Sequence, residues 1–262
     1  MNDRFDAPAD PVCAYSLPHY RHLLERAKAK YWLPLVREVA RAVPDRDLLL
    51  IRHDVDITPW SALRMAELEH SLGVHTTYYY RFHAPFYNLM AEDVIDSVRA
   101  VARMGHEVGL HYEPGFFLAR DMDPVQGTRN DIRTFEDLVG FRTHSIAQHQ
   151  PAQGPVLADI SDEHPCAYQP ALVRGMPYFG DSGFHWREGC VCTKFHHRQV
   201  HTLIHPHSWV HDGRPWQDVL RGHARDLGDR ISHEMEDYVV HVAEYLARRA
   251  ELDRERERKY GG

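Results

Sequence analysis

Short apolar runs alternate along this chain with segments in which apolar residues recur every three or four positions. The run Leu48–Ile51 is long enough for one strand buried on both faces. Further strand patterns cover residues 74–82, 107–111 and 141–146, and helical patterns cover residues 58–72, 91–104 and 124–139. Four successive strand–helix units predict a parallel α/β sheet, and polar residues just past each strand indicate a closed or nearly closed barrel.

The segments on either side of this repeat are predicted to be mainly helical. Residues 17–43 have helical spacing, and residues 193–197 and 200–205 are expected to be late strands. Residues 216–252 form a long amphipathic pattern, expected to break near Gly228 and to bury one stripe: Leu220, Leu227, Ile231, Met235, Tyr238, Val242 and Tyr245. The mixed charges of residues 248–259 are typical of a solvated helix end or a frayed tail.

We expect a single domain over residues 1–262. Its parts are an irregular lead-in (1–15), an N-terminal helical cover (16–47), a barrel core (48–210), and C-terminal helices with a charged tail (215–262).

The charge balance limits the classes of partner. The chain has 31 Lys and Arg against 38 Asp and Glu, a net charge of −7, which argues against a nucleic-acid-binding surface. The first thirty residues lack the apolar core of a signal peptide, and no apolar run approaches the roughly 18 residues of a transmembrane helix. A cytoplasmic location is therefore expected, whereas the oligomeric state is not predicted.

Cysteine and histidine need separate interpretations. Four cysteines are too few for a disulfide framework in a chain of 262 residues. Cys190 and Cys192 could be half of a zinc site, but without a second cysteine pair at metal spacing we expect ordinary core or strand residues. The chain also has 21 histidines, most of which must be surface or hydrogen-bonded residues, because a mononuclear site uses only two or three.

The first strand ends in two acids. Asp54 and Asp56 point the same way on a strand, with Cα atoms roughly 6.6 Å apart, and Arg52 shares their face. Carboxylates held this close repel each other, so either one takes up a proton or a cation lies between them. The alternative is that both acids open a turn, although Thr58 and Pro59 already provide a helix cap and first-turn pair.

Acids and imidazoles recur at the ends of the later predicted strands. They are His111 with Glu113, then His149, then Asp181 with Trp186, and finally His205. A single histidine there is more often a hydrogen-bonded structural residue than a ligand, so the convergence of several carries the interpretation.

Five ordered segments point to a family. They are Arg-His-Asp-Val-Asp (52–56), Gly-His-Glu-Val-Gly-Leu-His (105–111), Gly-Phe-Arg (140–142), Tyr-Phe-Gly-Asp-Ser-Gly-Phe-His-Trp (178–186) and Leu-Ile-His-Pro (203–206). Together they resemble the motifs of the polysaccharide deacetylases of carbohydrate esterase family 4, and most closely those of a divergent branch that includes O-antigen deacetylases. The resemblance implies a distorted, incomplete (β/α) barrel that holds one divalent metal, first of all Zn²⁺ with Co²⁺, Ni²⁺ or Mn²⁺ as alternatives. The implied reaction is hydrolysis of an N-acetyl group on an amino sugar or glycan.

The resemblance also implies roles for particular residues. Asp54 would be the general base, oriented by Arg142, and His205 would be the general acid. Asp56 and His111 would be metal ligands. The chain departs from the family where Val55 separates the two acids and where Gly115 replaces a second histidine. The third ligand must then come from elsewhere, and we expect His149, with Glu113 as the runner-up.

Three more residues are expected at the substrate. Glu113, Asp181 and Trp186 lie at strand ends, and Trp186 could offer an aromatic face to a sugar ring, although such aromatic groups are more often core. Two other functions stay open, since a fold does not fix a function. One is a metal-dependent hydrolase of another amide C–N bond, and the other is a catalytically degenerate sugar-binding or scaffold domain.

Overall fold

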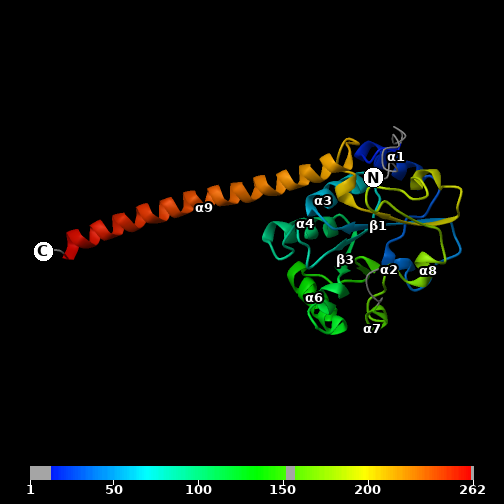
Figure 1. Cartoon of the computed structure of the whole chain (residues 1–262), viewed down its shortest axis with the longest axis horizontal. Coiled ribbons are helices and arrows are strands. Elements are labelled where there is room, and N and C mark those ends of the chain that lie inside the picture. Colours follow the sequence, from blue (N-terminus) through cyan, green and yellow to red (C-terminus); the bar gives the residue numbers. More distant parts are fainter. Residues whose placement is uncertain (1–12, 152–156, 261–262) are drawn as a thin grey trace. The chain divides into compact units, whose positions relative to one another are not determined.

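A single parallel sheet organises the protein (Figure 1). The computed structural model describes residues 13–151 and 157–260. The six strands are β1 (Leu48–Val55), β2 (Thr77–Tyr80), β3 (Glu107–Tyr112), β4 (Ile146–Gln148), β5 (Tyr178–Gly180) and β6 (Gln199–Ile204). They lie in the order β4-β3-β2-β1-β6-β5, and each neighbouring pair is parallel. Because β4 and β5 are edges that do not pair with each other, the sheet is an open, incomplete (β/α) barrel, and the predicted fold class is confirmed.

Helices fill the connections between the strands. They are α1 (Leu17–Lys28), α2 (Val36–Val39), α3 (Pro59–Ser71), α4 (Glu92–Arg103), α5 (Pro114–Leu118), α6 (Pro124–Val139), α7 (Ala158–Ser161), α8 (Pro170–Val173) and α9 (Trp216–Tyr260), with the 3₁₀ turns η3 (Val191–Thr193) and η4 (Pro206–Ser208). The chain divides into two compact units, Met1–Trp216 and Gln217–Gly262. The sheet and helices α1 to α8 belong to the first.

The two faces of β1 have separate environments. Leu49 and Ile51 pack in a core cluster with α1, whereas Leu48 and Leu50 pack in a second cluster with α2 and α8. All four are at most 1% exposed, and burying an aliphatic side chain of this size stabilises the fold by about 1.5–3 kcal/mol. Side chains alternate along a strand, so Arg52 and Asp54 share the face of Leu48 and Leu50. They are therefore directed to the side of the sheet that packs against α2 and α8.

Helices α3, α4 and α6 cover the other side of the sheet, in a third core cluster with β2 and β3. Gly109 in β3 is needed for a close approach, because a Cβ atom there would overlap the carbonyl oxygen of Ser145 just before β4. This approach sets the end of β4 beside the end of β3.

Several predicted elements differ from the structure. The helix predicted over residues 17–43 is two helices, because Pro34 cannot continue a helix and Trp32 bonds to the backbone of Asp47 and Leu49 instead. The fourth strand begins at Ile146 and not at residue 141, and residues 193–197 form no strand: Thr193 ends the turn η3 and the others follow it. Of the predicted lead-in, residues 1–12 lie outside the described residues.

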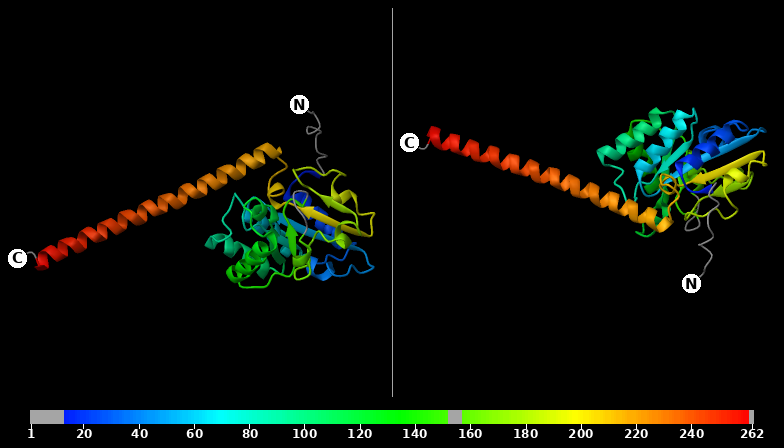
Figure 2. Two further views of the ribbon diagram at one scale, coloured as in Figure 1. Left: turned by 60° about the horizontal axis from the view of Figure 1, so that its bottom comes forward. Right: turned by 90° about the horizontal axis from the view of Figure 1, so that it is seen from above.

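Helix α9 also differs from its prediction. It is one uninterrupted helix through Gly228, because a single glycine lowers helix stability by only about 1 kcal/mol (Figures 1 and 2). Its predicted stripe is not buried: Ile231, Met235, Tyr238 and Tyr245 are all more than half exposed. In the part of the chain that the structure describes, no helix is both long enough and apolar enough to cross a membrane.

Candidate active site

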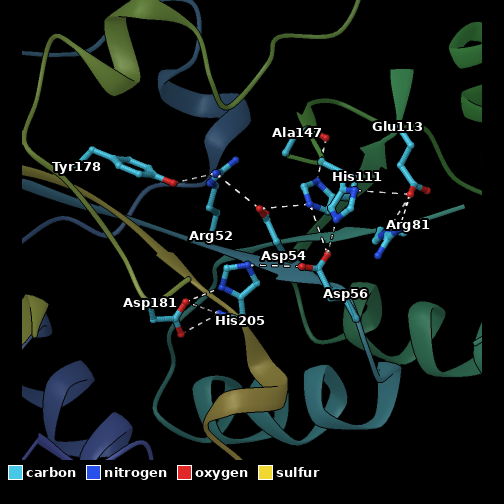
Figure 3. A network of polar contacts seen from close by, with 12 residues as sticks. Arg52, Asp54, Asp56, Arg81, His111, Glu113, Ala147, Tyr178, Asp181 and His205 are labelled. Atoms are coloured by element: carbon cyan, nitrogen blue, oxygen red, sulfur yellow. Dashed lines mark hydrogen bonds and ion pairs between the residues drawn. The ribbon is translucent and has the colours of Figure 1, made fainter. Parts of the chain in front are cut away.

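Five of the predicted residues converge at the carboxyl edge of the sheet (Figure 3). Asp54 is the last residue but one of β1, Asp56 directly follows that strand, His111 lies in β3 and His205 directly follows β6. His149 directly follows β4. These strands are neighbours in one parallel sheet, so their carboxyl ends meet at one edge. The sequence separation of about 150 residues between Asp54 and His205 is closed by the pairing of β1 with β6.

Asp56, His111 and His149 form a group with the donor atoms of a metal site, all within 4.8 Å of one another. The Nε2 atoms of His111 and His149 lie 3.6 and 3.9 Å from Asp56 Oδ1. On the other side, His205 Nε2 lies 3.6 Å from Asp56 Oδ2, and His111 Nε2 lies 3.5 Å from Asp54 Oδ2. All of these distances exceed the 2.7–3.2 Å of ordinary hydrogen bonds, and they are about the spacing of ligand atoms that share one cation.

The oxygens of the two acids support this interpretation. Asp54 Oδ1 and Asp56 Oδ1 are buried, and neither has a hydrogen-bond partner among the described residues. A buried carboxylate oxygen without a partner loses free energy, and a cation would remove that loss. Two imidazoles and a carboxylate are the donors that Zn²⁺ accepts in sites with an open position, so the residues fit the metal that the sequence predicts.

Backbone and side-chain acceptors fix the rings of two of these histidines. His111 Nδ1 lies 3.0 Å from the carbonyl oxygen of Ala147, and His205 Nδ1 lies 2.6 Å from Asp181 Oδ1. With Nδ1 donating in each case, Nε2 is the atom that faces the acids.

The group also sets the protonation of its members. Burial alone would raise the pKa of Asp56, but the electrostatic interaction with its neighbouring histidines, first His111 and then His205, lowers it to about 2. Burial, with the nearby charge of His111, lowers the pKa of His149 to about 4. Asp56 is therefore ionised and His149 neutral near neutral pH, which are the forms that bind a metal.

The pKa of His205 is raised, unlike that of His149. Burial lowers its pKa, but the carboxylate of Asp181 outweighs burial and raises the pKa to about 9. Asp181 also accepts from the backbone N–H of His205 and, at 2.7 Å, from Trp209 Nε1. A fully buried carboxylate with these partners holds His205 in its protonated form and leaves Asp181 itself inaccessible to a substrate.

Arg52 is the cation beside Asp54, and sequence reasoning assigned it no role beyond a shared face. Its Nη2 lies 3.7 Å from Asp54 Oδ2 and donates to Tyr178 Oη at 3.2 Å. Its guanidinium carbon lies 4.1 Å from the ring centroid of Tyr168. The two-residue spacing between Arg52 and Asp54 was the signal that could have identified this pair.

Arg142 does not join the site. Its side chain is 80% exposed and lies 3.5 Å from Glu136. It lines a pocket of about 460 Å³ together with Glu107, the first residue of β3, so it lies at the amino edge of the sheet. The reason is that β4 starts later in the chain than predicted. Residue 142 therefore lies before the strand, and His149 lies after it.

Glu113 lies beside the site and is held by a residue that sequence reasoning missed. It accepts from Arg81 Nε and Nη2 at 3.0 and 2.5 Å, and its Oε1 lies 3.7 Å from His149 Nδ1. Arg81 directly follows β2, so its position past a strand end was a usable signal. Arg81, Glu113, Phe116 and His149 line a pocket of about 360 Å³.

Trp186 packs elsewhere. Its ring lies edge-on to Trp209 with centroids 6.3 Å apart, in the core cluster that contains α1. No local sequence pattern could have identified Trp209, because it reaches Asp181 only when the residue after η4 meets the residue after β5 in the folded chain.

Comparison with known proteins gives similarity of structure only. No family model matches the chain, and no curated protein matches it in sequence. Among solved structures, it is similar to a chitin deacetylase from Colletotrichum lindemuthianum (16% identity, TM-score 0.33), over 39% of this chain and 46% of that one. It is similar to a mutant of a CE4 family pseudoenzyme with restored enzymatic activity (12% identity, TM-score 0.43), over 71% of this chain and 64% of that one. It is also similar to a peptidoglycan deacetylase from Bdellovibrio bacteriovorus (10% identity, TM-score 0.41), over 76% of this chain and 53% of that one.

The matched part therefore spans between 46% and 64% of the length of these three proteins. With TM-scores below 0.5, the assignment of an activity depends on the side chains of the site.

Proposed function

We propose that this chain is a metal-dependent hydrolase that removes an N-acetyl group from an amino sugar of a surface polysaccharide, such as O-antigen, or of its precursor. The five ordered sequence motifs support this proposal, as does the meeting of their acids and histidines at one edge of the sheet. The chain is accordingly proposed as a divergent member of the polysaccharide deacetylases.

Asp56, His111 and His149 are the residues that would hold the cation. A divalent ion bound there supplies Lewis-acid chemistry, polarising a carbonyl oxygen and lowering the pKa of a water molecule from about 15.7 toward 7. His149 takes the place of the family histidine at whose position this chain has Gly115. It lies within reach of Asp56, whereas Glu113 is hydrogen-bonded to Arg81.

Asp54 is the general base. Its Oδ1 has no hydrogen-bond partner among the described residues and can accept the proton of an attacking water, while Arg52 Nη2 lies 3.7 Å from Oδ2. General-base catalysis of this kind contributes about 100- to 10,000-fold to a rate. Arg52 thereby assumes the positioning role that the family resemblance assigned to Arg142.

His205 is the general acid on the opposite wall. An amine leaves slowly unless it is protonated, and the bond to Asp181 keeps the proton of His205 in place near neutral pH. Asp181 is thus a positioning residue for His205. The pocket lined by Arg81, Glu113 and Phe116 is the proposed place for the sugar.

The observation that carries the proposal is Asp56 Oδ1, which is buried without a hydrogen-bond partner among the described residues and has the Nε2 atoms of His111 and His149 at 3.6 and 3.9 Å. The test loads the chain with Zn²⁺ or Co²⁺ and measures acetate release from acetamido sugars, for the unchanged chain and for Asp54→Asn. We expect metal-dependent release that falls at least about 100-fold in the variant. Asp45→Asn, which removes a largely exposed acid, is the matched control and should retain full activity.

Two outcomes would replace the proposal. Release of amine from non-sugar amides, with none from acetamido sugars, would assign the chain to other C–N bonds. If Asp56→Ala binds as much metal as the unchanged chain, with the same rise in melting temperature, the chain is a non-catalytic binding domain.

A further inference from the structure

A second group of metal-ligating side chains lies apart from the active site. It consists of Cys13, His19, Cys190 and Cys192, whose donor atoms all lie within 4.8 Å of one another. Cys13 precedes α1, His19 lies in the first turn of α1, and Cys190 and Cys192 lie at the turn η3. Residues as far apart as Cys13 and Cys192, 179 positions in sequence, are therefore brought together by the fold.

The measured spacings match a tetrahedral zinc site. Cys13 Sγ lies 3.5 Å from Cys192 Sγ, and Cys190 Sγ lies 3.8 Å from His19 Nε2. With Zn–S bonds of about 2.3 Å and Zn–N bonds of about 2.0–2.1 Å, tetrahedral geometry places two sulfurs roughly 3.8 Å apart and a sulfur and a nitrogen roughly 3.6 Å apart. These two pairs are therefore at the spacing of ligands that share one zinc ion, and all four donors lie within 4.8 Å of one another.

His19 is oriented as a metal-bound histidine is. Its Nδ1 lies 2.9 Å from the carbonyl oxygen of Ala14, which fixes Nδ1 as the donor and leaves the lone pair of Nε2 directed at Cys190. The ring also packs against Trp209, with centroids 5.5 Å apart, so it cannot easily turn away. Such a backbone acceptor behind a ligand histidine is the usual support of a zinc site.

Neither a disulfide nor an ordinary apolar core accounts for this arrangement of donors. A disulfide would need sulfurs about 2.05 Å apart, not 3.5 Å. As core residues, Cys190 and Cys192 would be explained by burial alone, but burial does not account for three thiols and an imidazole nitrogen that all lie within 4.8 Å of one another. The sequence prediction that both are ordinary residues considered only cysteine pairs, and it missed a site completed by one distant cysteine and one histidine.

We infer that Cys13, His19, Cys190 and Cys192 form a structural zinc site of the Cys₃His type. Binding exchanges the three thiol protons for the ion, leaving three thiolates and one neutral imidazole around Zn²⁺ with a single net negative charge. Arg26, whose Nη1 donates to the carbonyl oxygen of Cys192 at 3.2 Å, lies where it offsets that charge. Four protein ligands leave no open position, so the role of this ion is structural and not catalytic.

The site would stabilise one wall of the active site. His19 contacts Trp209, Trp209 donates to Asp181, and Asp181 holds His205. A metal at this position therefore fastens α1 and the turn η3 behind the residue proposed as the general acid. The zinc site itself does not depend on the proposed function.

Cobalt substitution of the whole chain tests this inference. Thiolate ligands give Co²⁺ strong near-ultraviolet charge-transfer absorption, which the oxygen and nitrogen donors of Asp56, His111 and His149 cannot give. We expect this absorption in the unchanged chain and in Asp56→Ala, and a marked decrease in Cys190→Ser and in Cys192→Ser, each of which removes one of the three thiolates. Zinc analysis should correspondingly find two ions per chain and one in each of these variants.

The matched control is Cys166→Ser, which changes a buried cysteine that contacts Tyr112 and Tyr168. It should keep the charge-transfer absorption. Because the spectrum of the unchanged chain is itself decisive, a cysteine variant that fails to fold does not weaken the test.

Three results would overturn the inference. They are a folded, reduced chain that binds cobalt without sulfur absorption, absorption of undiminished intensity in both Cys190→Ser and Cys192→Ser, or a Cys13–Cys192 disulfide in the chain purified without reductant. None of them would affect the active-site proposal, which is tested by acetate release.

Discussion

Two buried carboxylates in this protein, Asp56 and Glu69, lie among histidines, and they differ in how their oxygens are satisfied. Glu69 of α3 is on the helix-covered side of the sheet and is fully buried. It accepts hydrogen bonds from Tyr20, His53, Thr76 and Tyr78, those of the last three at 2.7–2.8 Å. Asp56, at the edge of the sheet, has Oδ1 buried without a partner among the described residues and imidazoles at 3.6–3.9 Å.

Charge alone does not distinguish the two groups. Burial opposes ionisation in both, yet neighbouring histidines lower the pKa of Asp56 and of Glu69 to about 2. What differs is the set of hydrogen bonds: both oxygens of Glu69 accept hydrogen bonds, whereas Asp56 Oδ1 accepts none among the described residues and has donor atoms at the spacing of a shared ion. A carboxylate–histidine group therefore becomes a candidate site when its oxygens are left unpartnered. Part of the surplus of histidines has a structural role instead, since His53 and His106 belong to the Glu69 group.

The largest expected effect follows from Asp56→Asn. Removing the charge that three histidines share should abolish tight metal binding at the active site, leaving only the ion of the Cys₃His site, and lower kcat/KM by more than about 100-fold. The free energy of unfolding of the metal-free chain should change by less than about 1 kcal/mol, because no hydrogen bond is lost at Oδ1. Metal titration with urea unfolding measures both. A large loss of stability would remove the distinction between the two groups.

Glu69→Gln should have the reverse effect. It leaves buried donors without an acceptor, and breaking a buried charged group of this kind costs about 3–5 kcal/mol. Urea unfolding measures the loss, with Glu67→Gln on the exposed side of the same helix as the control. The metal affinity of the folded variant should equal that of the unchanged chain, and a marked decrease would contradict a purely structural role.

The same residue gives a pH dependence. Folding lowers the pKa of Glu69 from 4.5 to about 2, so its stabilisation is complete above about pH 4.5 and is lost as the pH falls toward 2. Between these values, the unfolding free energy of Glu69→Gln should fall less steeply with acid than that of the unchanged chain. If the unfolding free energies of the two chains fall in parallel with pH, the ionisation of Glu69 is not linked to folding.

Asp181→Asn should have an intermediate effect on catalysis. Partners that orient a functional histidine contribute about 10- to 100-fold, and kcat/KM should fall by that factor. Since Asp181 raises the pKa of His205, its loss should also move the alkaline limb of the pH–rate profile to lower pH. If the alkaline limb stays at the same pH in Asp181→Asn, His205 is not the residue that donates the proton.

The smallest effect is expected for Arg142→Ala. The side chain is 80% exposed and remote from the acids, so activity should stay within about two-fold and stability within about 0.5 kcal/mol. Arg52→Lys, at the buried position beside Asp54, should by contrast lower kcat. If activity falls in Arg142→Ala but not in Arg52→Lys, Arg142 has the role that the family resemblance implied, which is to orient the general base.

The contrast between Arg52 and Arg142 also shows what the sequence could predict. Strands β1 and β3 are long and apolar enough to be recognised, so Asp54, Asp56 and His111 were correctly placed at one edge. Strands β4 and β5 have three residues each, too few for a periodic pattern, and the error at β4 misplaced Arg142.

Long-range contacts were beyond prediction for a different reason. The partners of Asp181 and of Cys192 come from segments far away in sequence, so no local pattern reveals them. His149 was found because its position after a strand needed only the approximate end of β4.

The most direct test of the central claim is anomalous diffraction from crystals of the chain loaded with Zn²⁺. We expect a peak within about 2.0–2.2 Å of one oxygen of Asp56 and of the Nε2 atoms of His111 and His149. Crystals in which zinc occupies other positions, while these three side chains remain unliganded, would contradict the account.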